Sequence, residues 1–182
     1  SEMCIRDRNE TATVQDESTD SNTDSTGSTT SLVQDNRVLQ IPDDNYRTYY
    51  ELFVYSFYDS DGDGIGDLQG VLEKLDYLND GDDTTDMDLG INGIWLMPVM
   101  PSVTYHKYDT TDYENIDPQY GTLETFQELL TACHDRGIRV ILDLAMNHSS
   151  SKHPWFLQAV EYLKNLPEGA EPDSSECPYV DY

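Results

Sequence analysis

The sequence predicts an α/β protein built on a parallel sheet, and three observations support this prediction. Apolar segments rich in β-branched or aromatic residues, at 51–57, 91–98 and 138–148, have the composition of strands. Two segments with apolar residues at helical spacing lie between them. The strand starts are roughly 40 residues apart, which leaves room for the right-handed crossovers that connect parallel strands.

The first predicted strand, residues 51–57, leads into a loop of Asp and Gly residues. Asp67 ends this loop and is expected to cap a helix, because Asp is a favoured N-cap residue. The apolar positions of that helix share one face: Leu68, Val71, Leu72, Leu75 and Leu78.

The second predicted strand, residues 91–98, ends at Pro98 and is followed by a long polar loop. Thr122 is expected to cap the next helix, and Gly137 marks its C-terminal end. The expected buried face of that helix is formed by Leu123, Phe126, Leu129, Leu130 and Cys133.

The third predicted strand lies within IRVILDLAMNH, residues 138–148, and its apolar first half is expected to be buried on both faces. Asp143, Asn147 and His148 follow at the carboxyl end, where parallel β/α proteins carry their chemistry. An alternative is that His148 has a purely structural role.

Two architectures fit this element order: an open doubly wound sheet or a (β/α) barrel. The long loops follow strands, which favours the barrel, because a barrel carries its functional loops there. A complete barrel needs about 250 residues. We therefore predict a partial (β/α)8 TIM barrel that contains strands one to three and helices one and two.

Residues 9–47 are rich in Ser, Thr, Asp and Asn, and we expect a disordered polar linker. Such spacers often follow the export signal or lipid anchor of a bacterial surface protein, which places the folded part outside the cell. An arbitrary disordered tail is the alternative. Residues 1–8, SEMCIRDR, resemble the translation of a sequencing-library adapter and are expected to be an artefact.

The formal net charge of -26 and the isoelectric point of about 4.1 argue against binding to nucleic acids or anionic membranes. Three cysteines, Cys4, Cys133 and Cys177, lie far apart, so free thiols are expected. No apolar run approaches the roughly 20 residues of a membrane span.

The loop DSDGDGIGD is a candidate calcium site, because alternating carboxylates with glycines between them can surround a hard cation. An EF-hand needs an acidic residue at loop position 12, and Gly70 occupies that position. An acidic turn that only caps the next helix is the alternative. The expected ligands are Asp59, Asp61, Asp63, Asp67 and the carbonyl oxygen of Ile65.

The loop after the second strand, TYHKYDTTDYENIDPQYG, is dense in Tyr, Asp and His. Aromatic faces beside carboxylates suit a sugar, which stacks its C–H groups and hydrogen-bonds through its hydroxyls. A surface loop anchored by its tyrosines is the alternative. The residues alone therefore predict a parallel β/α protein with a candidate cation loop and a candidate sugar site.

Together these motifs resemble the catalytic domain of the α-amylase family, glycoside hydrolase family 13. DLAMNH resembles the family motif Asp-x-x-x-Asn-His at the end of strand three, and the two loops resemble the family's calcium loop and its segment after strand two. The resemblance implies an N-terminal fragment of that domain, with the barrel at 48–147 and the start of an inserted domain B at 148–182.

The resemblance also implies roles for individual residues. Tyr108 would be the platform under the sugar ring, His148 would hydrogen-bond that sugar, and His106 would line the same pocket. Asp143 would orient the network around the nucleophile, and Asn147 would ligate a structural calcium ion.

One position departs from the family pattern: Lys107 stands where many members carry Gly, and it is expected to alter the rim of the pocket.

The implied activity is retaining hydrolysis of α-glucosidic bonds in α-glucan or maltooligosaccharides, by two carboxylic residues about 5 Å apart. In the family these residues lie on strands four and five, so this fragment is expected to be inactive. A catalytically silent amylase-like accessory domain is the main alternative. A calcium-dependent docking module is a further one, and Gly70 argues against it.

Overall fold

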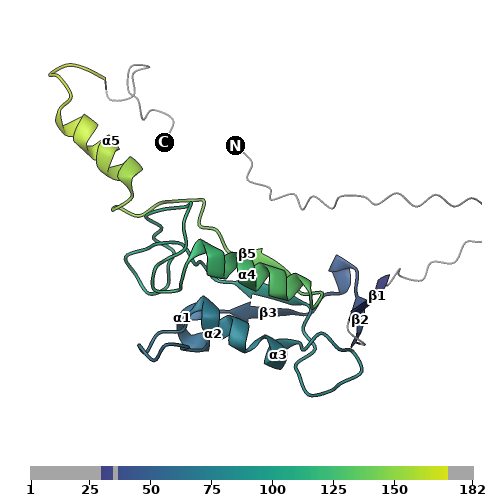
Figure 1. The fold of residues 1–182 in the computed structure, drawn as a ribbon. Helices are drawn as coiled ribbons and strands as arrows, with labels where there is room; N and C mark the ends of the chain where they lie inside the picture. The colour runs from purple at the N-terminus through teal and green to yellow at the C-terminus, as the bar shows by residue number, and fades with distance from the viewer. Residues whose placement is uncertain (1–29, 35–36, 172–182) are drawn as a thin grey trace, which may run out of the picture.

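The computed structural model describes residues 30–34 and 37–171 (Figure 1). Its centre is a three-stranded parallel sheet with the strand order β3-β4-β5, as expected for part of a (β/α) barrel. The bounds of the central elements are β3 Tyr49–Leu52, α2 Leu68–Glu73, α3 Leu75–Leu78, β4 Gly93–Leu96, α4 Leu123–His134 and β5 Arg139–Leu142.

One face of the sheet packs against helices α2 and α4. Leu52, Ile94 and Leu96 point to this side and form one hydrophobic core with Val71 of α2 and Leu129 of α4. Each side chain buried in this way contributes roughly 1.5–3 kcal/mol to folding. The predicted helix faces are therefore confirmed in their central turns.

The first turn of α4 is an exception. Leu123 was expected on the buried face but is 44% exposed, because it is the first residue of the helix and lies beyond the edge of the core.

The opposite face of the sheet is open to solvent. Glu51, Trp95 and Ile141 are aligned in the strand register and form one row across the three strands. Trp95 is 43% exposed and Ile141 is 45% exposed. The expectation that the third strand is buried on both faces is therefore wrong for β5, because within the described residues only one face is covered.

The first strand is shorter than expected because the chain turns directly after Leu52. Residues Val54–Phe57 form the short helix α1, and the acidic loop packs against its backbone. Gly66 donates to the carbonyl oxygen of Tyr55 over 2.8 Å, and a Cβ atom at Gly66 would lie 2.0 Å from the carbonyl oxygen of Val54. Only glycine allows this close approach.

The predicted first helix is divided in two at Lys74, which ends α2 and precedes α3. Lys74 has a non-helical backbone conformation, although both halves keep their apolar side chains in the core. The third predicted strand is also shorter than expected, because β5 ends at Leu142, so Asp143 comes directly after it.

Part of the expected disordered linker has regular structure. Strands β1, Thr30–Gln34, and β2, Arg37–Ile41, form an antiparallel hairpin, and the 3-10 helix η1, Asp44–Tyr46, follows. Leu39 is buried and lies beside Gly137 at the start of β5. The polar composition of the segment gave no indication of the buried Leu39 side chain. Residues 1–29 lie outside the described residues.

Arg47 connects the amino ends of β4 and β5. Its Nη1 atom donates to the carbonyl oxygens of Asn92 and Gly137, both over 2.8 Å. Its side chain is only 2% exposed, and its Nε atom also bonds to Asp44 over 2.7 Å. Leu39 of the hairpin, which lies beside Gly137, and Arg47 are thus both at the amino end of the sheet.

The segment after β5 contains helix α5, Pro154–Lys164. Proline at the first helical position suits a helix start, and His153 caps the helix by accepting from the backbone N–H of Trp155 over 3.1 Å. Trp155, Phe156, Leu157 and Leu163 of α5 are exposed.

Two further expectations concern membrane spans and cysteines. Within the described residues, every helix is too short or too polar to cross a bilayer. Cys133 is a free, buried thiol, and burial raises its pKa to about 12. Cys4 and Cys177 lie outside the described residues.

Candidate functional site

Two loops meet at the carboxyl ends of β4 and β5. Asp143 follows β5 directly, and its backbone N–H donates to the carbonyl oxygen of Leu96, the last residue of β4, over 2.8 Å. The hydroxyl of Tyr108, from the loop after β4, donates to Oδ2 of Asp143 over 2.6 Å. This hydrogen bond, with smaller contributions from burial and from the charge of Asp143, raises the pKa of Tyr108 to about 12.

Both predicted histidines lie beside Tyr108. His148 Nε2 lies 3.0 Å from the carbonyl oxygen of Tyr108, and this oxygen can only accept, so Nε2 carries the proton. His106 Nδ1 accepts from the backbone N–H of Tyr108 over 3.1 Å, and the two rings are 5.9 Å apart. The chain therefore brings His106, Tyr108, Asp143 and His148 into one cluster.

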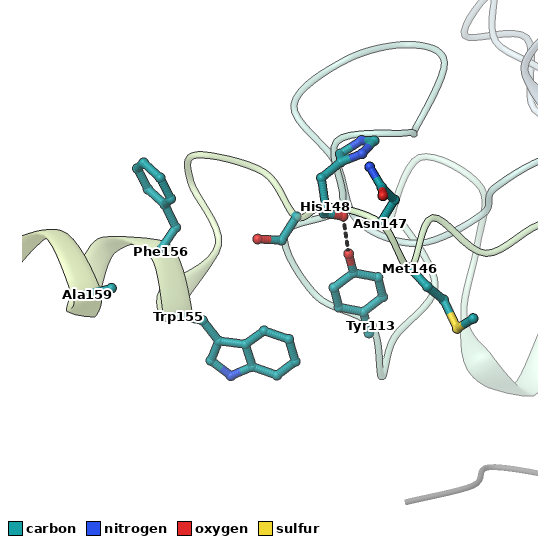
Figure 2. A pocket seen from close by; sticks show the side chains of 8 residues that line it. Tyr113, Met146, Asn147, His148, Trp155, Phe156 and Ala159 are labelled. Atoms are coloured by element: carbon teal, nitrogen blue, oxygen red, sulfur yellow. Dashed lines mark hydrogen bonds between the residues drawn. The ribbon is translucent and has the colours of Figure 1, made fainter. Parts of the chain in front are cut away.

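Tyr113 holds the segment after β5 in place and was missed as a separate site residue by the sequence reasoning. Its hydroxyl lies 3.0 Å from the carbonyl oxygen of Ala145 and 2.8 Å from that of His148, and Figure 2 shows the contact with His148. The only sequence signal was its place in the tyrosine-rich loop. Tyr113 thus holds the backbone of the segment that carries His148.

A cavity of about 470 Å³ lies beside this cluster. Figure 2 shows Tyr113 and His148 on one side of it and Trp155 and Phe156 of α5 on the other. The rings of Tyr113 and Trp155 are stacked, with centroids 6.0 Å apart and an angle of 19° between their planes. The lining residues are Tyr113, Met146, Asn147, His148, Ser149, Trp155, Phe156 and Ala159.

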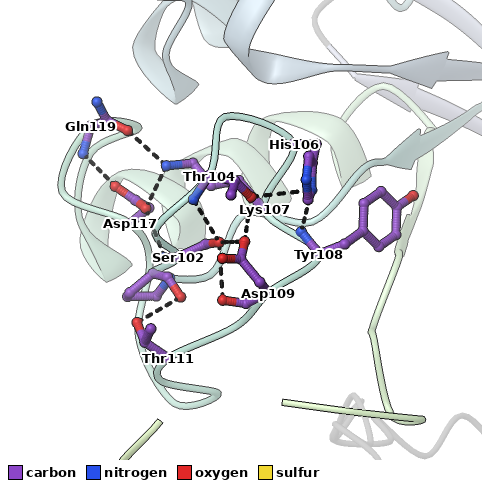
Figure 3. A network of polar contacts seen from close by, with 10 residues as sticks. Ser102, Thr104, His106, Lys107, Tyr108, Asp109, Thr111, Asp117 and Gln119 are labelled. Atoms are coloured by element: carbon purple, nitrogen blue, oxygen red, sulfur yellow. Dashed lines mark hydrogen bonds and ion pairs between the residues drawn. The ribbon is translucent and has the colours of Figure 1, made fainter. Parts of the chain in front are cut away.

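Lys107 does not reach the rim of the pocket, so that expectation is wrong. Its side chain points into the protein and is 1% exposed (Figure 3). Nζ donates to Oδ2 of Asp117 over 2.6 Å and to Oε1 of Gln119 over 2.7 Å. A positive φ of 63° directs the side chain to this inner side of the loop.

Asp109 stabilises the turn around Lys107 from the other side. Its carboxylate accepts hydrogen bonds from the hydroxyls of Ser102 and Thr104. Burial alone would raise the pKa of Asp109, but these hydrogen bonds outweigh burial and hold the pKa below its usual range. The loop that carries His106 and Tyr108 is therefore held by the Lys107–Asp117 ion pair and by the hydrogen bonds of Asp109.

The acidic loop brings together three of its expected metal ligands. Asp59, Asp61 and Asp67 each offer an oxygen, and these oxygens lie within 4.8 Å of one another. The backbone N–H of Gly64, and next that of Gly62, donate to Asp59 and hold its pKa below the usual value.

The donor set fits calcium, because Ca²⁺ takes oxygen ligands at about 2.3–2.6 Å and ligand oxygens across the ion are then about 5 Å apart. Asp67 also caps α2 by accepting from the backbone N–H of Gly70 over 2.6 Å. Asp67 therefore also has the helix-capping role that the alternative interpretation of this loop gave it.

The other expected metal ligands lie outside this group of three. The Asp63 carboxylate accepts from the backbone N–H of Ile65 over 2.7 Å, so Asp63 and Ile65 form a local turn within the loop. Asn147 belongs to the segment after β5, where it lines the cavity.

Comparison with known proteins gives a consistent family. The family model described as "Alpha amylase, catalytic domain" matches residues 51–182. Alpha-amylase 3 of Dictyoglomus thermophilum is 46% identical over 134 residues, which cover 74% of this chain and 23% of that protein. Alpha-amylase SusG of Bacteroides thetaiotaomicron is 47% identical over 133 residues, which cover 73% of this chain and 16% of that protein.

Solved structures give the same result. Amy13B of Eubacterium rectale matches with a TM-score of 0.69 and 65% identity, over 76% of this chain and 26% of that one. An alpha-amylase from H. orenii matches with a TM-score of 0.63 and 66% identity, over 63% of this chain and 24% of that one. The chain thus spans about a quarter or less of the length of these proteins.

Proposed function

Because this chain belongs to the α-amylase catalytic-domain family, we propose that it forms the first three strands of a retaining hydrolase of α-glucosidic bonds. The proposed substrate is an α-glucan or a maltooligosaccharide. The relatives include proteins named alpha-amylase and oligo-1,6-glucosidase, which supports an α-linked glucose polymer or oligomer as substrate.

The observation that carries this proposal is the cluster of Tyr108, Asp143, His106 and His148 at the carboxyl end of the sheet. A sugar ring presents C–H groups that stack on an aromatic face and hydroxyls that need polar partners. We propose Tyr108 as the stacking platform. His148 and His106 would supply hydrogen bonds from the side of the same ring.

Asp143 is proposed as an orienting group instead of the nucleophile. One of its oxygens already accepts the hydroxyl of Tyr108 over 2.6 Å, which fixes the carboxylate in position. A retaining glycosidase needs two further carboxylic residues about 5–5.5 Å apart across the scissile bond. By family resemblance these lie on strands four and five, so we propose that this chain alone does not cleave the bond.

We also propose calcium as the cofactor of the acidic loop. Asp59, Asp61 and Asp67 would be its carboxylate ligands, and the separation of their oxygens supports this. Asp63 and the carbonyl of Ile65 would join them, and Asn147 would serve a second calcium site. When bound, the cation would neutralise part of the strong negative charge of the loop and so stabilise it.

An extracellular or cell-surface location on a bacterium is our proposal for the folded part. The polar composition of residues 9–29 supports it, because such spacers often separate an anchor or export signal from a catalytic domain.

The proposed substrate is tested by NMR titration of the 182-residue chain with maltoheptaose. We expect resonances of the loop around Tyr108 and of the segment after Asp143 to shift, with no sugar released. Tyr108→Ala should abolish the shifts, and Tyr46→Ala is the matched control because Tyr46 is 76% exposed.

Two results would contradict the proposal. Equal binding of a β-linked glucan would exclude α-glucan specificity, and release of sugar above background would show that the cleaving groups lie within this chain. A catalytically silent accessory domain is distinguished by a longer protein that carries strands four and five. That protein should hydrolyse maltoheptaose if the parent is an enzyme, and should bind it unchanged if it is not.

A further inference from the structure

Lys107 has an unusual backbone conformation for its residue type. In the part of the chain that the structure describes, it is the only non-glycine residue with a positive φ, 63°. Side chains other than glycine are disfavoured in this region, because Cβ then approaches the backbone closely. A lysine at such a position therefore needs compensating contacts.

The main compensating contact is a buried ion pair. Nζ of Lys107 lies 2.6 Å from Oδ2 of Asp117 and 2.7 Å from Oε1 of Gln119, and 5.0 Å from the centre of the Tyr120 ring. The side chains of Lys107 and Asp117 are 1% and 6% exposed. Asp117 in turn accepts from the backbone N–H of Ser102 over 3.2 Å.

These contacts join three points of one loop. Ser102 lies near the beginning of the segment between β4 and α4, Lys107 lies between His106 and Tyr108, and Asp117 lies near the end of that segment. Figure 3 shows the lysine side chain directed to Asp117 and Gln119, while the Tyr108 ring extends to the opposite side. The Lys107 side chain is thus directed away from Tyr108, which extends towards the candidate site.

We infer that the buried Lys107–Asp117 ion pair is a positioning device that holds the ring of Tyr108 against Asp143. This inference rests on the proposed function, which gives the Tyr108 ring its role as a platform. A desolvated ion pair with additional hydrogen bonds fixes geometry, because any departure leaves a charge buried without a partner. Lys107 is therefore a positioning residue, and it does not touch the substrate.

The test uses the complete 182-residue chain with 13C-labelled tyrosine rings, with Tyr108→Phe assigning the Cζ resonance of Tyr108. In the wild type this resonance should differ from those of exposed tyrosines at neutral pH and titrate at about 12. In Lys107→Met and in Lys107→Gly it should move towards the exposed tyrosines, and its pKa should fall towards the ordinary value of 10.0.

Lys152→Met is the matched control, because it removes an exposed lysine and should leave the Tyr108 resonance unchanged. Lys107→Gly removes the side chain at a backbone conformation that suits glycine. It therefore separates the effect of the ion pair from that of the positive φ. Circular dichroism at each pH verifies that the variants remain folded.

If the variants with a single substitution at Lys107 do not fold, two further variants test the inference. The double variant Lys107→Met with Asp117→Asn leaves no uncompensated buried charge, and Gln119→Leu removes one acceptor at an exposed residue. Both should shift the Tyr108 resonance in the same direction. If the melting temperature falls while the Tyr108 resonance keeps its position and pKa, the ion pair has a structural role only, and the inference is overturned.

The readout involves no sugar, so it is independent of the test of the proposed function. A chain that fails to bind maltoheptaose but shows the Tyr108 shift contradicts the proposed substrate only. A chain that binds maltoheptaose without the Tyr108 shift contradicts the positioning role only.

Discussion

The hydroxyl of Tyr108 donates a 2.6 Å hydrogen bond to Oδ2 of Asp143, 35 residues further along the chain. The bond connects the loop after β4 with the segment after β5 at the carboxyl edge of the sheet. It therefore holds an aromatic face and a carboxylate in a fixed relation, as a sugar-binding site requires.

Replacement of Tyr108 by Phe should lower the free energy of unfolding by about 1–2 kcal/mol, because a hydrogen bond to a charged group is lost while the ring is kept. Urea denaturation measures this change. Tyr46→Phe, at an exposed position, should change stability by less than about 0.5 kcal/mol. Equal effects of the two substitutions would show that the Tyr108–Asp143 bond contributes nothing.

The same hydrogen bond predicts a pH dependence at high pH. The pKa of Tyr108 is raised in the folded chain, from 10.0 to about 12, so its contribution to stability is fully present below pH 10. This contribution should disappear as the pH rises from 10 to about 12. The difference in unfolding free energy between wild type and Tyr108→Phe measures it, and a pH-independent difference would contradict the prediction.

Calcium should raise the melting temperature of the chain through the acidic loop. A site that binds only the folded state gains about 2.7 kcal/mol when free calcium is a hundredfold above Kd. Asp59→Asn with Asp61→Asn should remove the shift, and Asp86→Asn in a separate acidic loop should retain it. Calorimetry with and without a chelator tests this, and an unchanged melting temperature would exclude the site.

Arg47→Met should destabilise the fold by about 3 kcal/mol, because two carbonyl oxygens lose their charged donor. Arg136→Met is the comparison, because Arg136 donates to one backbone carbonyl oxygen, that of Ala132, and to the exposed carboxylate of Asp76, and its side chain is 21% exposed. Its loss should cost less, about 1 kcal/mol. Chemical denaturation of both variants measures the difference, and similar values would contradict the role assigned to Arg47.

The sequence predicted the parallel sheet and the buried helix faces because these depend on local periodicity. Val71 and Leu129 lie in the core as their spacing required. The acidic loop was predicted from its alternating Asp and Gly residues, and the place of Asp143 at the carboxyl edge followed from the rule that parallel β/α proteins carry their chemistry there. The resemblance to the α-amylase family implied that Tyr108 and Asp143 belong to one pocket, but no spacing rule indicates that the Tyr108 hydroxyl bonds directly to the Asp143 carboxylate, and the structure was needed for this contact.

Other features depended on contacts that are distant in sequence. Leu39 of the β1–β2 hairpin is buried although the segment around it is polar in composition, so composition predicted disorder instead. The inward direction of Lys107 depends on its positive φ, which a lysine rarely adopts. The exposure of Ile141 depends on what covers the second face of the sheet, and strand composition does not determine this.

The Arg47 guanidinium also constrains the order in which the chain folds. Its two acceptors lie 45 and 90 residues further along the chain, so the complete contact has a high sequence separation. During synthesis, β3 and β4 can pair as soon as residue 96 is available, but Arg47 still lacks its second acceptor. The amino end of the sheet is therefore completed late, once the chain up to Gly137 has been made.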